Sequence, residues 1–268
     1  MATGIVSVAV DDQSQHLIST VLAVSAAGLM AVLTVLAAVG WRRSPPDLAE
    51  IDVVLRLFTF VAACTVLAVR FAGSAAGWPL TVAALAVWLA LMVVLLARMR
   101  RIGWHGLRGG ARGAWELASV ATSGLAIAFG ELRIGAVATV FWLLGLAWYV
   151  VMTMLILQRM AGQGLRGYEF TPDTWILMGA LAISTLAGVH VHLLWPSRIV
   201  VAVTIAAWTV ASLWILFLLH IGLRLLPTLA TAGAFWALVF PLGMYSSATY
   251  ALADELGWDR LQLLSAVF

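Results

Sequence analysis

The sequence predicts an all-helical membrane protein whose ten transmembrane helices form five similar helical hairpins around a central pore. Three observations lead to this fold class. Of the 268 residues, 63% are hydrophobic and 10% are charged, whereas soluble proteins carry about 25% charged residues. Apolar stretches of about 20 residues, the length of a helix that crosses a bilayer, alternate with shorter and more polar stretches. Small hydroxyl side chains recur in the polar stretches at intervals of about 60 residues, which is the length of two helices and two turns.

The individual helices follow from this alternation. The strongly apolar stretches are predicted to be even-numbered helices, and they cover residues 17–40, 78–97, 134–157 and 199–219. The more polar stretches between them are predicted to be odd-numbered helices, and they cover residues 53–72, 114–130, 174–194 and 234–253. Residues 1–10 and 261–268 are apolar but too short to span, so we expect truncated first and last helices. The connections are short, so residues 1–268 form a single transmembrane domain.

The basic residues predict the orientation in the membrane. All fifteen are arginine, and the absence of lysine excludes chemistry that needs an amine, such as a Schiff base. Eleven arginines lie in or beside the connections that follow the even helices, and four lie on the opposite side. Because cytoplasmic loops are enriched in Arg and Lys, we expect a multi-pass protein of the plasma membrane with both termini in the cytoplasm. No basic stretch alternates with exposed aromatic residues, so we expect no nucleic-acid partner.

Signals of an enzyme or a metal site are weak. The single cysteine, Cys64, lies in an apolar run. His190 and His192 are two positions apart and cannot share a helical face as an i, i+4 metal pair does. We therefore expect neither enzymatic activity nor a cofactor.

The recurring hydroxyl side chains are the candidate pore lining. They lie near the middle of the predicted odd helices, and glycines accompany them. The candidates are Thr3, Ser7, Thr59, Thr65, Ser119, Thr122, Ser123, Ser184, Thr185, Ser246 and Ser247. An alternative is that these hydroxyls bond to backbone carbonyls of their own helices, as Ser and Thr commonly do in membrane helices.

The distribution of acidic residues favours passive anion permeation. None of the twelve acids falls at the centre of a predicted span; Glu116 lies one turn into its helix and Asp254 at the end of another. Ion-coupled transporters commonly place an ionisable group at mid-depth. Hydroxyl groups replace part of an anion's hydration shell, and arginines at the cytoplasmic mouth concentrate anions. The sequence therefore predicts an anion channel or facilitator.

Five segments, one in each predicted odd helix, carry a family resemblance. They are MATGIVS at 1–7, FTFVAACTVLAVR at 58–70, WxxxSVATSGLAI at 115–127, PDTWILMGALAISTLAG at 172–188 and FWALVFPLGMYSSATYALA at 235–253. These segments resemble the tellurite-resistance/dicarboxylate transporter family. That family includes TehA-type bacterial channels, fungal malate and sulfite transporters, and the slow-type anion channels of plant guard cells.

The resemblance implies ten helices in five quasi-repeated hairpins around a pore, a homotrimer of separately conducting protomers, and a phenylalanine gate. In the anion channels the gate lies in a Trp-x-x-x-Phe-Pro context, which here begins at Trp236 and makes Phe240 the gate, followed by Pro241. A proline inside a helix removes a backbone hydrogen bond and kinks the helix. The kink is expected to aim the Phe240 ring into the pore.

Three functions remain open at this point. The first is an anion channel or facilitator whose partners are small anions, inorganic or C4-dicarboxylate, and the lipid bilayer. The second is a proton-coupled transporter of C4-dicarboxylates such as malate, or of tellurite-related oxyanions, with His190 or His192 as the first candidates for proton coupling. The third is a membrane scaffold or sensor that does not conduct.

Overall fold

The computed structural model describes residues 1–167, 170–225 and 232–267, and this part contains helices and no strands. The all-helical fold class is therefore confirmed. The α-helices are α1 (Ala2–Asp12), α2 (His16–Arg43), α3 (Ile51–Arg70), α4 (Gly77–Gly110), α5 (Leu117–Glu131), α6 (Gly135–Gly167), α7 (Ile176–Leu194), α8 (Arg198–Leu225), α9 (Ala232–Leu256) and α10 (Asp259–Ser265). Two short 3-10 helices, η1 (Gly113–Glu116) and η2 (Pro172–Trp175), precede α5 and α7.

Six helical segments in the described part are long and apolar enough to cross a membrane. They are α2, α3, α4, residues Gly135–Gly164 of α6, residues Pro172–Leu194 of η2 and α7, and residues Arg198–His220 of α8. The predicted span 114–130 differs, because its α-helix begins only at Leu117 and has 15 residues. At 1.5 Å per residue α5 is about 22 Å long. The first and last helices are also short, with 11 residues in α1 and 7 in α10.

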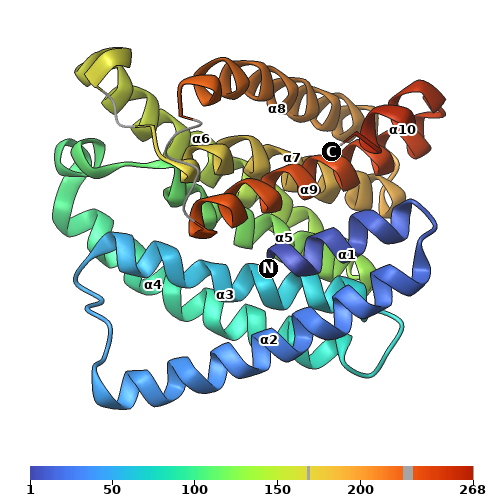
Figure 1. Cartoon of the computed structure of the whole chain (residues 1–268), viewed down its shortest axis with the longest axis horizontal. Helices are drawn as coiled ribbons and strands as arrows, with labels where there is room; N and C mark the ends of the chain where they lie inside the picture. The colour runs from blue at the N-terminus through green and yellow to red at the C-terminus, as the bar shows by residue number, and fades with distance from the viewer. Residues whose placement is uncertain (168–169, 226–231, 268) are drawn as a thin grey trace.

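The helices form a layered bundle. Helices α3, α5, α7 and α9 run side by side through the middle, with α2 and α4 along one edge and α6 and α8 along the other (Figure 1). Each odd helix contacts the next in the order α1, α3, α5, α7, α9, and α9 contacts α1, so the contacts close on themselves. Each even helix contacts the odd helix that precedes it. The odd helices are therefore the inner layer.

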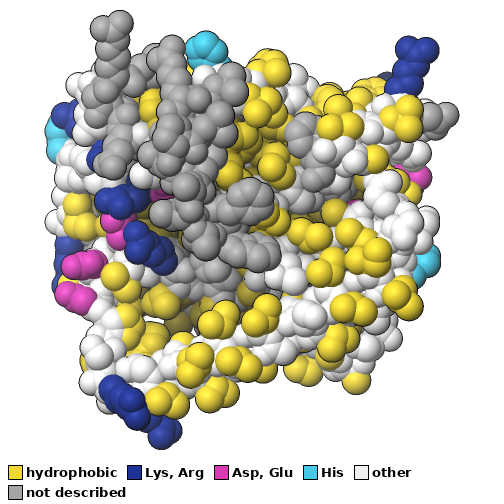
Figure 2. Space-filling view, viewed as in Figure 1, with side chains coloured by type: hydrophobic (Ala, Val, Ile, Leu, Met, Phe, Trp, Pro, Cys, Tyr) yellow, Lys and Arg dark blue, Asp and Glu magenta, His cyan; other side chains and the backbone are white. Residues whose placement is uncertain are grey.

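Burial follows the difference in polarity between the two sets of helices. Every residue of α5 from Leu117 to Gly130 is buried, whereas α2 buries only Ser19, Ala23 and Ala26. Large apolar side chains remain exposed along α2, α4, α6 and α8. Figure 2 shows hydrophobic side chains over much of α2 along the lower edge, while arginine and acidic side chains gather at the left edge. An apolar surface of this extent is suited to contact with lipid.

Pairs of equivalent features recur along the chain. Helices α4 and α6 each change direction at a glycine with φ of +69°, Gly103 and Gly164. A non-glycine residue rarely adopts this left-handed conformation. Each break is followed by a short 3-10 helix that leads into a buried helix, η1 into α5 and η2 into α7. The connections from α4 to α5 and from α6 to α7 therefore share one backbone pattern.

Candidate functional site

The five inner helices meet around a small cavity, which is the candidate functional site. Its volume is about 20 Å³, enough for about one water molecule. The lining residues are Ile5 and Val8 of α1, Thr65, Val66 and Val69 of α3, Gly124 and Ile127 of α5, Ile183 and Leu186 of α7, and Met244 of α9. All but Thr65 and Gly124 present apolar side chains. The cavity is therefore a narrow apolar constriction to which every inner helix contributes.

The close approach of α3 and α5 at this cavity requires a glycine. A Cβ atom at residue 124 would overlap the Thr65 hydroxyl oxygen. The Thr65 hydroxyl donates to the carbonyl of Ala62 at 3.0 Å, so its hydrogen-bonding capacity is partly used within its own helix. A lone pair of that oxygen remains as the polar group of the cavity wall.

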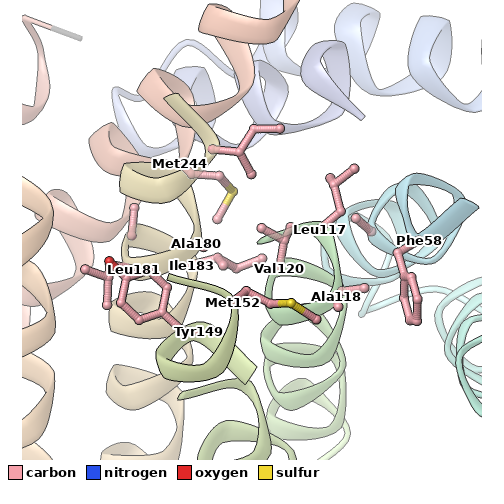
Figure 3. Packing of buried hydrophobic residues seen from close by; sticks show 14 of the residues in the cluster. Phe58, Leu117, Ala118, Val120, Tyr149, Met152, Ala180, Leu181, Ile183 and Met244 are labelled. Carbon is pink, nitrogen blue, oxygen red and sulfur yellow. The ribbon is translucent and has the colours of Figure 1, made fainter. Parts of the chain in front are cut away.

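Below the cavity, toward the beginnings of the odd helices, the bundle is filled by apolar side chains. Figure 3 shows Met244, Ile183, Val120 and Leu117 together, with Phe58 of α3 on one side and Tyr149 of α6 on the other. Val120, Leu117 and Phe58 all belong to one buried hydrophobic cluster. The inner helices are therefore packed closed on this side of the cavity.

Phe240 and Pro241, the predicted gate residues, lie on α9 next to this region. Phe240 is 2% exposed and precedes Met244 by four residues, so the two side chains share one face of the helix. Pro241 packs against Gly179 of α7, where an added Cβ would lie 3.0 Å from the proline Cβ. The Trp236 side chain lies outside the described part of the structure. Phe240 is thus placed one turn from the cavity, although it is not among the cavity's lining residues.

The structure does not bring the predicted lining hydroxyls together around one lumen. Of that set, only Thr65 lines the central cavity. Thr3 and Thr59 line a separate groove of about 400 Å³ between α1, α2 and α3. Ser7 donates to the Gly4 carbonyl, and Ser246 donates to the Ser265 carbonyl of α10.

Four of the six remaining predicted hydroxyls bond to a neighbouring helix. Thr122 accepts a hydrogen bond from the Trp88 indole of α4 at 2.8 Å. Ser119 donates to the Gly145 carbonyl of α6, and the Ser123 and Ser184 hydroxyls lie 3.0 Å apart. Thr185 donates to the Leu181 carbonyl of its own helix. Ser247 is buried, and its hydroxyl lies near enough to Asp12 of α1 to lower the pKa of that carboxyl.

Three tryptophans in the middle of even helices donate hydrogen bonds to odd helices. Trp88 of α4 donates to Thr122, Trp142 of α6 donates to the Ser184 carbonyl, and Trp208 of α8 donates to Thr249. In each case the indole reaches the following odd helix. None of these three tryptophans was among the residues predicted to be functional. Their positions near the middle of long apolar stretches were the available signal.

The end of the bundle where the odd helices end carries paired charges. His190 of α7 contacts Glu131 of α5 at 2.9 Å, and Arg70 of α3 contacts Asp11 of α1 at 3.6 Å. The hydrogen bond from His190 holds the pKa of Glu131 below its ordinary value. Asp12 has no ion-pair partner among the described residues, and burial raises its pKa to about 6.

The opposite end places polar groups at the starts of α5 and α7. Asp52 accepts a hydrogen bond from the Trp115 indole at 2.6 Å and contacts Arg112 at 3.4 Å. Asp173 of η2 accepts from the Ala114 backbone amide. These contacts fix η1 beside η2.

Glu116 was predicted to lie one turn into its helix, and the structure shows in addition that its side chain is buried. It is 0% exposed, and one of its carboxyl oxygens accepts a hydrogen bond from Thr153 of α6 at 2.6 Å. The other oxygen has no partner in the described residues. In those residues no group of three or more His, Cys, Asp or Glu side chains is arranged to hold a metal ion.

Comparisons with known proteins agree with the membrane architecture. The chain is 31% identical over 121 residues to two uncharacterized membrane proteins of Mycobacterium tuberculosis, one from strain CDC 1551 and one from strain H37Rv. The match covers 39% of this chain and 58% of each relative. The model of the SLAC1 family, described as voltage-dependent anion channel, matches residues 1–268. The chain therefore belongs to the SLAC1 family of voltage-dependent anion channels.

Proposed function

We propose that this protein is an anion channel or facilitator that passes small anions, inorganic or C4-dicarboxylate, along the axis of α1, α3, α5, α7 and α9. The single observation that carries the proposal is the cavity lined by all five of these helices, in a chain of the SLAC1 family. The helices then act as five quasi-repeated hairpins, with the even helices facing lipid. The protein resides in the plasma membrane with both termini in the cytoplasm, in the orientation given by its arginines.

The geometry supports a pathway that is closed in this conformation. A cavity of about 20 Å³ is smaller than a hydrated anion, and an apolar constriction blocks ions by excluding water. Phe240, one turn from Met244 on the same face of α9, is the proposed gate, and Pro241 positions it. Opening therefore requires the side chains below the cavity to move apart. The proposed pathway uses Thr65 as its polar wall group.

Electrostatics support anions as the permeating species. Eleven of the fifteen arginines lie on the proposed cytoplasmic side, where their positive potential concentrates anions at the mouth. A homotrimer of separately conducting protomers is proposed from the family resemblance. Part of the exposed apolar surface of the even helices would then lie between protomers, and the rest would face lipid.

A second candidate function is proton-coupled transport of a C4-dicarboxylate or of a tellurite-related oxyanion. The observation that favours it is the set of titratable groups in contact between helices, namely the buried Glu116 at Thr153 and the His190–Glu131 pair. Such groups are the usual carriers of coupling protons in membrane proteins.

Reconstitution of the full chain in planar bilayers tests these functions against each other. For the channel, the reversal potential is expected to follow the anion gradient when chloride is replaced by nitrate or malate. It is expected to stay unchanged when the cation is replaced. Cation selectivity, or no anion permeability, contradicts the channel proposal. Malate flux into liposomes that stops when the pH gradient is collapsed favours the coupled transporter. Absence of flux under both conditions favours a scaffold or sensor.

A further inference from the structure

Four charged or titratable residues lie one helical turn beyond the lining of the central cavity, on the side where the odd helices end. Each follows a lining residue by four positions: Asp12 follows Val8, Arg70 follows Val66, Glu131 follows Ile127 and His190 follows Leu186. Residues four apart share a helical face. These four side chains therefore stand over the cavity from α1, α3, α5 and α7, and we refer to them as the mouth ring.

Two members of the mouth ring are joined directly. His190 Nε2 lies 2.9 Å from a Glu131 carboxyl oxygen, and His190 Nδ1 lies 2.9 Å from the Leu186 carbonyl. Because a carbonyl only accepts, Nδ1 carries a proton and donates it. A hydrogen bond between Nε2 and Glu131 then places one further proton between these two groups, and with that proton the pair has no net charge.

Arg70 is also engaged with other groups. Its guanidinium donates to the Ser19 hydroxyl of α2 at 2.9 Å and contacts Asp11 at 3.6 Å. Asp11 also contacts His16 of α2 at 3.0 Å. Asp11 therefore takes the contacts with both Arg70 and His16, and Asp12 is left as the carboxyl of the mouth ring without an ion pair among the described residues.

The surroundings of Asp12 make its charge sensitive to pH. Burial raises its pKa to about 6, the neighbouring Asp11 acts in the same direction, and Ser247 of α9 and His190 lower the pKa in part. The other titratable groups around it are engaged elsewhere: Glu131 is near Arg133 as well as His190, and His192 of α7 contacts Glu255 of α9.

We propose that Asp12 is a proton-controlled selectivity residue at the outer mouth of the pathway, where its carboxylate repels entering anions and its protonated form admits them. The inference rests on the proposed anion channel. The His190–Glu131 and Arg70–Asp11 contacts engage the other charged groups of the mouth ring, which leaves Asp12 as its carboxyl without an ion pair among the described residues. A single negative charge at the mouth of a narrow, weakly solvated passage opposes an anion directly.

The direction of the pH effect follows from the Asp12 carboxyl. At pH 8 it is ionised and anion entry is opposed, whereas at pH 5 it is mostly protonated and entry is favoured. We expect anion flux at pH 5 to be about fivefold higher than at pH 8, the size expected for one partly screened charge at a pore mouth.

The test measures chloride flux in liposomes that contain the full chain, with the same pH on both sides at pH 5 and at pH 8. Equal pH removes any proton gradient, so coupled transport does not produce the difference. Asp12→Asn is expected to give high flux at both values and a ratio near one. Asp254→Asn is the matched control, because Asp254 is exposed on α9 near the same end, and it is expected to keep the wild-type ratio.

A second variant keeps the test decisive if Asp12→Asn fails to fold. Ser247→Ala removes the hydroxyl that favours the Asp12 carboxylate, so the midpoint of the flux-versus-pH curve is expected to move to higher pH. A wild-type ratio of one, an Asp12→Asn variant with the wild-type ratio, or an unmoved midpoint in Ser247→Ala overturns the inference. Wild-type protein that passes no chloride at either pH contradicts the channel proposal itself. Chloride flux that is equal at pH 5 and pH 8 contradicts only the role of Asp12.

Discussion

The hydroxyls of Ser123 on α5 and Ser184 on α7 lie 3.0 Å apart, although the two residues are 61 positions apart in the sequence. Ser184 also donates to the Ala180 carbonyl at 2.8 Å, so Ser123 donates to Ser184. The pair lies beside α6, where a Cβ at Gly145 would overlap the Ser123 hydroxyl. These two serines are thus joined to each other and do not line the central cavity.

Removal of this contact is expected to change stability and leave permeation intact. In a double-mutant cycle of Ser123→Ala and Ser184→Ala, we expect a coupling energy of about 0.5–1.5 kcal/mol, the value of one buried hydrogen bond. Thermal unfolding in detergent gives the stability, and liposome flux gives the function. A tenfold loss of anion flux in either folded variant would place the hydroxyls in the pathway after all.

Phe240→Ala is expected to raise anion conductance, because deletion of the ring removes an apolar block next to Met244. Stability is expected to fall by about 3–5 kcal/mol, as for other buried phenylalanines. Single-channel recording measures the conductance. Phe141→Ala is the matched control, because Phe141 is buried on α6, where it stacks on Phe129, and does not line the cavity. Equal conductance in the wild type and in Phe240→Ala would remove Phe240 as the gate.

Ile183→Ala is expected to widen the central cavity and increase anion flux, because a wider apolar passage holds water more readily. Ile183 lines the cavity, whereas Ile156 is equally buried on α6 and does not. Both alanine variants are expected to lose about 2–5 kcal/mol of stability. Only Ile183→Ala is expected to raise the flux per folded molecule in a liposome assay. The same increase in Ile156→Ala would show that general loosening is responsible.

Gly179→Ala is expected to destabilise the contact between α7 and α9. The added Cβ would lie 3.0 Å from the Pro241 Cβ and 3.1 Å from its Cα, and overpacking of this kind costs about 1–3 kcal/mol. Gly28→Ala on the exposed face of α2 meets no atom within 4 Å, so it is expected to stabilise its helix by about 0.5–1 kcal/mol. Melting temperatures in detergent compare the two. A Gly179→Ala protein as stable as the wild type would contradict the tight packing of Pro241.

Asp12→Asn is expected to stabilise the protein at neutral pH and to have no effect at pH 3. Burial raises the pKa of Asp12 to about 6 from an ordinary value of 3.8. Below pH 3.8 the carboxyl is protonated in both states. Between pH 4 and 6 the unfolded chain releases the proton while the folded chain keeps it, so stability falls as pH rises. The loss above pH 6 is at most about 3 kcal/mol. Melting curves at pH 4 and pH 7 measure it, and an unchanged difference between the variant and the wild type across this range would contradict the burial of this charge.

The sequence by itself determined the class of protein and the approximate helices. Sustained hydropathy requires membrane spans, since no other environment accommodates such long apolar stretches, and the 235–253 segment with its Phe-Pro pair indicated the family. The extent of α5 was predicted less well, because residues 114–116 adopt a 3-10 turn that tertiary contacts, such as the Asp173 carboxylate on the Ala114 amide, hold in place.

Only the tertiary structure decided the directions of the side chains. A hydroxyl in a helix whose whole circumference is apolar or small carries no periodic signal of the face it occupies, so Thr65 and Thr122 look alike in the sequence. The structure distinguishes them. The Trp88 indole of α4 donates a hydrogen bond to Thr122, whereas Thr65 packs against Gly124 and lines the central cavity. The charged residues of the mouth ring could also be read from the sequence. Only the tertiary structure shows that the ends of four separate helices bring them together beside the cavity.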